Sequence, residues 1–380
     1  KGVITMVYKN FKQLKLSALG MGSMRLPLID GNNAKIDEKK ATEMVAYAIE
    51  NGINYYDTAW GYHDGNSEIA MGNILSKYPR EKYYLATKFP GYDVSNMDKV
   101  EEIFEKQLEK CKVDYFDFYL FHNVCELNIE QYLDEKYKIH EYLMKQKQNG
   151  RIRHLGFSIH GSYDVMKRFL EKYGKDMEFC QIQLNYIDLS FQHADDKIKL
   201  LKQYDIPVWV MEPLRGGKLC KLSENDTETL KQLRAEADAT EWAFRFLQSI
   251  PEVTMILSGM SSLEQLKQNI EIFQNEKPLN ETEKQTLFTI ADGMLNGKLP
   301  CTSCRYCTTH CPQQLDIPHL LELYNEHRFT GGGFIAPMVI GTLPEEKRPS
   351  ACIGCRSCEA VCPQQIKISE ALADFSAKLK

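Results

Sequence analysis

Apolar residues in the first 275 positions follow two periodicities that alternate along the chain. Short segments rich in β-branched and aromatic residues are typical of strands, and longer segments with apolar positions three and four apart are typical of amphipathic helices. Val100, Ile103 and Leu108 illustrate the helical spacing. The strand-like segments are a glycine-punctuated stretch near residues 20–24, a run that starts at residue 53, and residues 83–88, 115–122, 154–158, 179–185, 206–211 and 253–258.

Helix-like segments separate these strands, and their order predicts a fold. They lie at residues 38–50, 67–77, 97–110, 129–149, 163–173, 195–204, 240–248 and 262–273. Eight units of strand followed by helix predict an α/β protein of the (β/α)8 TIM-barrel type, here expected over residues 1–275. A doubly wound sheet is the alternative, but the sequence lacks the Gly-x-Gly-x-x-Gly turn that usually follows its first strand. Residues 7–19 alternate as a small hairpin does.

The chain changes character after the predicted barrel. Residues 276–300 are polar and predict a linker helix. Residues 301–317 (CTSCRYCTTHCPQQLDI) and 352–368 (CIGCRSCEAVCPQQIKI) then repeat one pattern, Cys-x2-Cys-Arg-x-Cys-x3-Cys-Pro-Gln-Gln. We therefore expect residues 301–380 to form a second, mainly helical domain.

Cysteine usage indicates the chemistry of this second domain. Of 12 cysteines, 8 lie in the two repeats. Tight clustering without a secretion signal favours metal over disulfides. In runs of this spacing three thiolates hold one [4Fe–4S] cluster and the fourth ligates the other cluster. This predicts one cluster on Cys301, Cys304, Cys307 and Cys362, and a second on Cys352, Cys355, Cys358 and Cys311. Zinc is the alternative, but zinc sites typically use two separated Cys-x2-Cys pairs.

Bulk properties exclude several classes of partner. Hydrophobic residues make up 43% and charged residues 26% of the chain, as in soluble globular proteins. The net charge of −5 and the lack of a basic run argue against nucleic acid. We find neither a signal peptide nor an apolar run long enough to span a bilayer. The expected location is therefore the cytoplasm, without membrane association.

Three predicted strand ends and one adjoining loop carry four residues that one reaction can use together. Residues 53–68 read INYYDTAWGYHDGNSE, which places Asp57 at a strand end and Tyr62 in the following loop. The next two strands end in Lys88 and His122. The carboxyl ends of barrel strands converge on one mouth, so these four side chains are expected to meet there.

These residue types suit the reduction of a carbonyl group. Tyrosine is a weak acid, with a reference pKa of about 10. A nearby Lys88 ammonium favours the phenolate by about 4 kcal/mol at roughly 4 Å and an effective dielectric of about 20, before desolvation opposes it. Asp57 would keep Lys88 charged and oriented. His122 would donate to the carbonyl oxygen or relay the proton.

Asp57, Tyr62, Lys88 and His122 resemble the catalytic tetrad of the aldo-keto reductases. The similarity covers about residues 7–275 and includes the motifs GSM at 22–24, GNSE at 65–68, GFS at 156–158, QIQLN at 181–185 and EPL at 212–214. It implies a small carbonyl or alcohol substrate and a nicotinamide cofactor, NADPH or NADH, across the barrel mouth. The cofactor contacts implied are Gly22, Ser23, Met24, Asp57, Ser158, Gln183, Met211, Glu212, Pro213, Leu214, Arg215, Gly216, Gly217, Gly259, Ser261, Ser262, Gln265 and Asn269.

The chain departs from the family pattern at three places. Met211 stands where an aromatic ring usually stacks on the nicotinamide, although a thioether also packs on aromatic faces. Ile159 and His160 follow Ser158 where an Asn is common. Gly259 and Gln265 occupy positions where many members clamp the adenosine 2′-phosphate with Lys or Arg. The last departure slightly favours NADH.

The barrel and the cysteine repeats together resemble a bacterial aldo-keto reductase subgroup with a C-terminal domain similar to two-cluster ferredoxins. Hydride carries two electrons and each cluster passes one, and no flavin signature is evident in the sequence. Three hypotheses stay open: clusters that transfer electrons to a redox partner, clusters that are purely structural, and a non-catalytic electron-transfer or redox-sensing module. The complete tetrad argues against the third.

Overall fold

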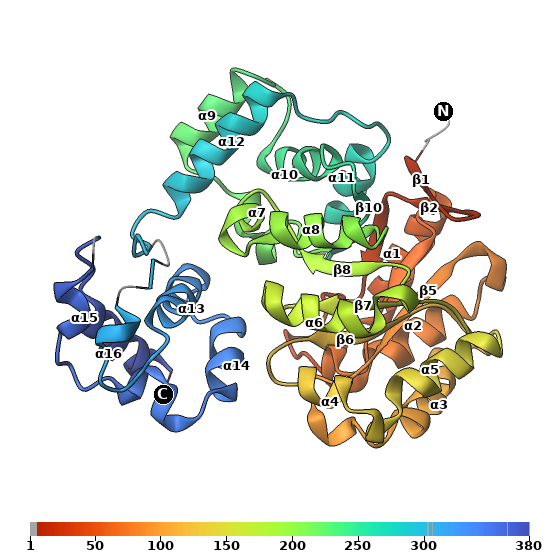
Figure 1. The fold of residues 1–380 in the computed structure, drawn as a ribbon. Coiled ribbons are helices and arrows are strands. Elements are labelled where there is room, and N and C mark those ends of the chain that lie inside the picture. The colour runs from red at the N-terminus through yellow and green to blue at the C-terminus, as the bar shows by residue number, and fades with distance from the viewer. Residues whose placement is uncertain (1–5, 302–303, 306, 363, 380) are drawn as a thin grey trace. The chain divides into compact units, whose positions relative to one another are not determined.

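The computed structural model describes residues 6–301, 304–305, 307–362 and 364–379. The chain divides into two compact units, and the division falls between Ile290 and Ala291 (Figure 1). We call residues 6–290 the barrel unit and residues 291–379 the cysteine-rich unit. Helix α12 (Glu281–Met294) contains the point of division.

The barrel unit is a closed parallel barrel of eight strands, which confirms the predicted (β/α)8 fold. Neighbouring strands hydrogen-bond in the order β10-β3-β4-β5-β6-β7-β8-β9. Ahead of it, β1 (Tyr8–Phe11) and β2 (Leu14–Ser17) pair as the predicted antiparallel hairpin. The barrel strands are β3 (Leu19–Gly22), β4 (Tyr55–Asp57), β5 (Tyr84–Phe89), β6 (Phe116–Val124), β7 (Ile152–Ile159), β8 (Cys180–Gln183), β9 (Val208–Met211) and β10 (Val253–Gly259).

Amphipathic helices surround the barrel (Figure 1). The predicted helix at residues 129–149 is in fact two helices, because Lys138 adopts a left-handed φ of 53° that no α-helix accommodates. The helices are α1 (Glu38–Glu50), α2 (Ser67–Leu75), α3 (Val100–Cys111), α4 (Ile129–Leu133), α5 (Ile139–Gln148), α6 (Tyr163–Tyr173), α7 (Asp188–Phe191), α8 (Ala194–Gln203), α9 (Glu224–Lys231), α10 (Ala239–Gln248) and α11 (Leu263–Ile272).

Aromatic side chains fill the amino-terminal half of the barrel. Phe11 of the hairpin packs edge-on against Trp209 of β9 at 5.1 Å and lies 5.7 Å from Phe118 of β6. Tyr55 of β4 and Phe179, just before β8, belong to the same buried cluster. The hairpin therefore closes this end of the barrel. At the opposite end, where the strands terminate, polar side chains such as Asp57 and Lys88 are found.

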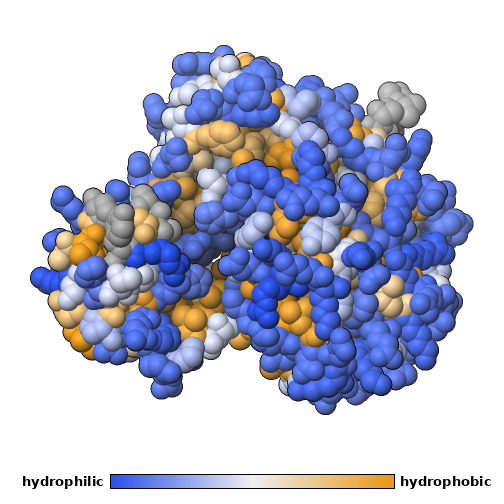
Figure 2. All heavy atoms as spheres, viewed as in Figure 1, coloured by the Kyte–Doolittle hydropathy of each residue, from blue (hydrophilic) through white to orange (hydrophobic). Residues whose placement is uncertain are grey.

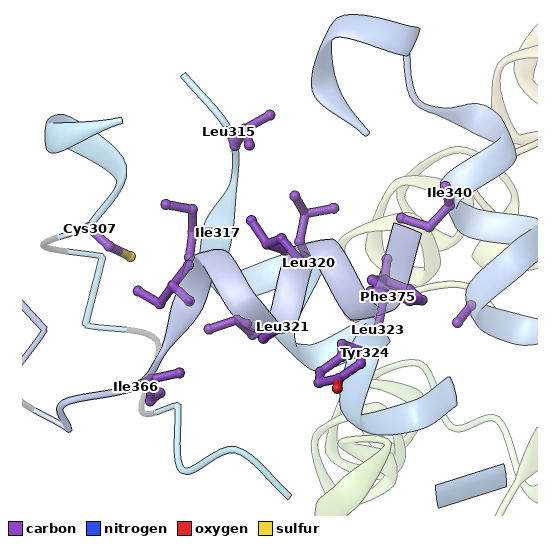
Figure 3. Packing of buried hydrophobic residues seen from close by; sticks show 14 of the residues in the cluster. Cys307, Leu315, Ile317, Leu320, Leu321, Leu323, Tyr324, Ile340, Ile366 and Phe375 are labelled. Atoms are coloured by element: carbon purple, nitrogen blue, oxygen red, sulfur yellow. The ribbon is translucent and has the colours of Figure 1, made fainter. Parts of the chain in front are cut away.

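The cysteine-rich unit is mainly helical, as predicted. Its helices are α13 (Ile317–Thr330), α14 (Ile335–Thr342), α15 (Ser357–Ala360) and α16 (Ile368–Lys378). Leu320, Leu321 and Tyr324 of α13 pack with Ile340 of α14 and Phe375 of α16 (Figure 3). Cys307 and Cys358 are part of this buried cluster. One thiol of each repeat is thus anchored in the apolar core of the unit.

The polarity of the surface and the length of the helices are the two features to compare with the expectation of no membrane association. Hydrophilic residues predominate on the face of the molecule drawn in Figure 2. Within the described ranges, every helix is too short or too polar to cross a lipid bilayer.

Candidate functional site

The structure brings together the four side chains found at the predicted strand ends. The ammonium of Lys88 on β5 is fully buried and donates to Asp57 Oδ1 at 2.6 Å and to the Thr58 carbonyl at 2.7 Å. Lys88 Nζ lies 5.0 Å from the centroid of the Tyr62 ring. That ring meets the imidazole of His122, on β6, edge-on at 6.0 Å. One acid, one phenol, one ammonium and one imidazole therefore form a single cluster.

Tyr62 owes its position to a tightly fixed turn. His63, Asp64 and Gly65 follow it with left-handed φ values of 53°, 55° and 90°. Side chains other than Gly adopt such values at an energetic cost, so other contacts must hold the turn. The buried His63 ring supplies two of them: its nitrogens lie 3.0 Å from the carbonyl oxygens of Ser23 and Asn33.

Burial and charge act in opposite directions on Lys88 and Tyr62. Burial lowers the pKa of Lys88, but the Asp57 carboxylate raises it and prevails, so Lys88 remains an ammonium. Burial raises the pKa of Tyr62 by more than Lys88 lowers it. The opposition between Lys88 and desolvation is expected from the sequence, and in the folded protein desolvation is the stronger of the two. Tyr62 is therefore a protonated phenol at neutral pH.

His122 is neutral in this environment. Burial, followed by the charges of Lys88 and His160, lowers its pKa well below the ordinary value. Its buried Nδ1 has no hydrogen-bond partner among the described residues. A neutral imidazole has one N–H donor, which can serve a substrate oxygen at this position.

We expect His160→Gln to weaken the acid sensitivity of the barrel unit. Burial lowers the pKa of His160 to about 4, whereas an unfolded chain protonates near 6.5. The stability from this group is complete above about pH 6.5 and is lost as the pH falls toward 4, by about 2 kcal/mol at pH 5. Urea unfolding at pH 7 and pH 5, followed by Trp fluorescence, measures this difference, since all three Trp residues lie before residue 291. Equal pH dependence in wild type and variant would contradict the prediction.

A cleft of about 360 Å³ opens at the carboxyl ends of β3, β9 and β10. Asp57 and Tyr62 line one side of it. Most of the residues that the family resemblance implied as cofactor contacts line it too: Gly22, Met24, Met211, Glu212, Pro213, Leu214, Gly216, Gly217, Gly259, Ser261, Gln265 and Asn269.

Eight further residues line this cleft and were missed by the sequence analysis. They are Arg25, Gln181, Cys220, Thr240, Leu257, Ser258, Met260 and Gln268. Two of them lie at the end of a strand: Ser258 is the last residue of the predicted strand 253–258, and Met260 directly follows β10. Arg25 follows the GSM motif and is the one cation among the residues that line this cleft.

Two of the implied contacts support neighbouring backbone instead of lining the cleft. Ser23 is buried, and its hydroxyl donates to the Asp57 carbonyl at 2.8 Å. Ser158 is also buried, and its hydroxyl accepts from the Asn123 amide at 2.8 Å. Ser262 likewise stands outside the lining: it caps α11, accepting from the Gln265 amide at 3.3 Å.

Two other implied contacts, Arg215 and Gln183, bind Asp188 and do not line the cleft. Arg215 is buried, and its Nε donates to both Asp188 oxygens at 3.1 and 3.0 Å. A buried guanidinium needs a carboxylate partner, and Arg215 finds it in Asp188, so its role as a cofactor contact stays a prediction. Gln183 donates to the same carboxylate at 2.9 Å.

The cysteine-rich unit assembles thiols from both repeats. Cys301, Cys304 and Cys307 of the first repeat line one cavity together with Cys362 of the second. Its other walls include the apolar side chains of Pro318, Leu321, Ile366 and Ile368. The crossed set of four that the spacing predicts therefore surrounds a common space.

The second set also comes together. Burial, together with the proximity of Glu359, Cys352 and Cys311, raises the pKa of Cys358 to about 11. Cys355, the remaining member, is exposed, as is Cys304 in the first set. Each set thus combines one buried, two half-buried and one exposed thiol.

Four thiols that line one cavity fit a [4Fe–4S] cluster. In the part of the chain that is described, no group of three or more His, Cys, Asp or Glu side chains is arranged to hold one metal ion. Four thiols spread around a cavity with apolar walls suit a larger group. A [4Fe–4S] cluster is such a group, and thiolates hold it at its corners.

Comparisons with known proteins find a matching family model for each of the two units. Residues 18–290 match the model of the aldo/keto reductase family, and residues 300–367 match the model of the 4Fe-4S dicluster domain. The "Uncharacterized oxidoreductase YqkF" of Bacillus subtilis (strain 168) is 27% identical over 304 residues, which are 72% of this chain and 92% of that protein. The "NADH-specific methylglyoxal reductase" of Escherichia coli (strain K12) is 25% identical over 223 residues, 54% of this chain and 66% of that protein.

Solved structures show the same relationship. The holo form of aldo-keto reductase AKR11C1 from Bacillus halodurans is 25% identical and superposes with a TM-score of 0.61, over 75% of this chain and 96% of that chain. An aldo-keto reductase from Klebsiella pneumoniae in complex with NADPH is 19% identical with a TM-score of 0.61, over 75% and 96% of the two chains, and so shares the fold. The family match covers well over half of the chain, and the chain therefore belongs to the aldo/keto reductase family.

Proposed function

We propose that the barrel unit is an NAD(P)H-dependent oxidoreductase that interconverts a small carbonyl compound and its alcohol. One observation carries this proposal: a fully buried Lys88 is paired with Asp57 at 2.6 Å and faces the ring of Tyr62, beside a neutral His122. A phenol next to a fixed ammonium is suited to giving a proton to a developing alkoxide. In this proposal a nicotinamide nucleotide binds in the adjoining cleft.

A nicotinamide nucleotide held in the cleft would supply the hydride for reduction. Tyr62 gives its phenolic proton to the carbonyl oxygen, and Lys88 stabilises the phenolate that remains. Asp57 keeps Lys88 charged and directed at Tyr62. The N–H of His122 donates to the same carbonyl oxygen and orients the substrate. In oxidation the Tyr62 phenolate takes the proton back.

An anaerobic assay tests this proposal. Purified protein is incubated with NADH or NADPH and a panel of small aldehydes and ketones. We expect one nucleotide oxidised for each alcohol formed, because the carbonyl carbon takes up the hydride. Sustained nucleotide oxidation without a carbonyl compound, beyond the few electrons that the clusters can store, would overturn the proposal.

We expect the barrel unit to favour NADH. Gly259 and Gln265, which stand where many family members carry a Lys or Arg, line the cleft without a charge, and a relative from Escherichia coli is named NADH-specific. Gln265→Arg should raise kcat/KM for NADPH about tenfold relative to NADH, because one charge-assisted hydrogen bond contributes roughly 1.5 kcal/mol. Steady-state kinetics with both nucleotides measures the ratio. A ratio unchanged by the substitution would place the 2′-phosphate elsewhere.

The cysteine-rich unit, in the same proposal, holds two [4Fe–4S] clusters that exchange electrons with a redox partner protein. Cys301, Cys304, Cys307 and Cys362 hold one cluster, and Cys352, Cys355, Cys358 and Cys311 hold the other. The exposed thiols Cys304 and Cys355 support electron exchange over a purely structural role, since ligands at the surface would give a partner protein access to each cluster.

Electron paramagnetic resonance separates these two roles. The reconstituted protein is mixed with NADH or NADPH without oxygen or added flavin. A reduced-cluster signal would show that the clusters receive electrons from the nucleotide. No signal, in a preparation that reduces an aldehyde, would favour clusters that only stabilise the fold.

A further inference from the structure

A buried carboxylate lies behind the site and takes no part in the chemistry described above. Glu68 is in the first turn of α2 and is completely inaccessible to solvent. Burying a carboxylate costs several kcal/mol unless partners compensate it. Glu68 has such partners, and each of them leads back to the Tyr62 and Lys88 pair.

The first partner holds the backbone of Lys88. Gln107 of α3 is fully buried, and its Nε2 donates to Glu68 Oε1 at 2.7 Å and to the Lys88 carbonyl at 2.9 Å. Its Oε1 accepts from the hydroxyl of Tyr119 on β6 at 2.6 Å. The Gln107 amide is therefore fixed at both ends, and it fixes the strand position from which Lys88 projects.

The second partner holds the loop of Tyr62. Lys110 lies one turn further along α3, and its ammonium is 3.3 Å from Glu68 Oε2. The same ammonium donates to the Gly65 carbonyl at 3.3 Å and lies over the Trp60 ring at 3.9 Å. Trp60 and Gly65 flank the strained turn that carries Tyr62. Lys110 thus contacts that turn on both sides of Tyr62.

Glu68 joins Gln107 and Lys110. It also accepts from the hydroxyl of Thr87, which precedes Lys88, at 2.7 Å. One carboxylate oxygen binds Gln107 and the other binds Lys110, and residues three apart on a helix present both groups on the same face. We infer that Glu68, Gln107 and Lys110 form one positioning unit that sets the distance between the Tyr62 hydroxyl and Lys88 Nζ. This inference rests on the proposed roles of Tyr62 and Lys88.

The positioning unit sets a distance between two reacting groups. Its loss should therefore slow the chemical step and leave nucleotide binding intact. We expect Gln107→Met and Lys110→Met each to lower kcat about tenfold, because misplacement of reacting groups by a fraction of an ångström has effects of this order. KM for the nucleotide should change less than twofold, since the three residues do not line the cleft.

The pH dependence of kcat should change in these variants, whereas a loss of packing alone would leave it unchanged. A Lys88 ammonium further from Tyr62 stabilises the phenolate less, so the alkaline limb of kcat for carbonyl reduction should move to higher pH. The other ionisable groups near Tyr62 are unchanged by these substitutions; they are Asp57 on β4, Tyr92 after β5, His122 on β6 and Glu212 after β9.

Three comparisons complete the experiment. Lys106→Met, at an exposed position of α3 that pairs with Glu102, is the matched control and should behave as wild type. Lys110→Arg keeps the charge and should restore most of kcat. The double variant Gln107→Met, Lys110→Met should lose much less than a hundredfold, because both residues act through Glu68.

Each possible result either supports or overturns the inference. Lower kcat, unchanged nucleotide KM and a displaced alkaline limb support it. Variants that match Lys106→Met, or single effects that multiply in the double variant, overturn it. Lys110 is partly exposed, so Lys110→Met provides the answer even if Gln107→Met fails to fold. Tyr62→Phe is assayed in parallel: a fully active Tyr62→Phe would refute the proposed function, whereas an inactive one together with wild-type positioning variants would refute only this inference.

Discussion

Tyr62→Phe is expected to lower kcat for carbonyl reduction about a thousandfold, the largest effect of any substitution in the barrel unit. The change removes the proton that the alkoxide needs, and general acids contribute roughly a hundredfold to ten-thousandfold. The phenyl ring keeps its packing against His122 and Lys88. Steady-state assays with a simple aldehyde and NADH or NADPH measure the loss.

Two controls make this result specific. Tyr47→Phe removes a hydroxyl from α1, where the ring lies near Lys267, and should leave kcat unchanged. The iron content of Tyr62→Phe should equal that of wild type, because the thiols lie in the other unit. Turnover of Tyr62→Phe within threefold of wild type would refute the assignment of Tyr62 as the acid.

Cys362→Ser is expected to remove one entire cluster. Two [4Fe–4S] clusters contain about eight irons per chain, and the variant should retain about four. Cys220→Ser, a change in the barrel unit, is the control and should retain about eight. Iron analysis of anaerobically reconstituted protein and the spin count of the reduced protein measure the loss.

Double variants distinguish crossed from uncrossed ligation. Cys362 and Cys301 line the same cavity although they belong to different repeats. If they ligate one cluster, Cys301→Ser, Cys362→Ser should keep about four irons, and Cys301→Ser, Cys311→Ser should keep almost none. The opposite result would show that each repeat holds its own cluster.

The fold was predictable because its signals are local and repeated. Alternation of strand-like and helix-like segments predicted all eight barrel strands within a few residues of their observed positions. The helix expected at residues 129–149 failed at Lys138, whose left-handed conformation has no signature in residue type, unlike a glycine or proline. Such a break depends on the packing of neighbouring elements and not on the segment itself.

The candidate site was predictable only in part. Asp57, Lys88 and His122 follow from the strand ends, because a barrel brings those ends together. Arg215 does not, because the direction of its side chain depends on Asp188, which is 27 residues away in the chain. The protonation of Tyr62 likewise depends on burial, which no spacing of charged residues reveals.

Direct hydride transfer tests the central claim most closely. The protein is incubated without oxygen with NADH deuterated at the transferable position of C4 and with a simple aldehyde, and the alcohol is analysed by mass spectrometry. We predict one deuterium on the carbinol carbon with wild type and almost no alcohol with Tyr62→Phe. Alcohol that forms without deuterium when either C4 position is labelled would contradict the account, because the electrons would then have reached the substrate by another route.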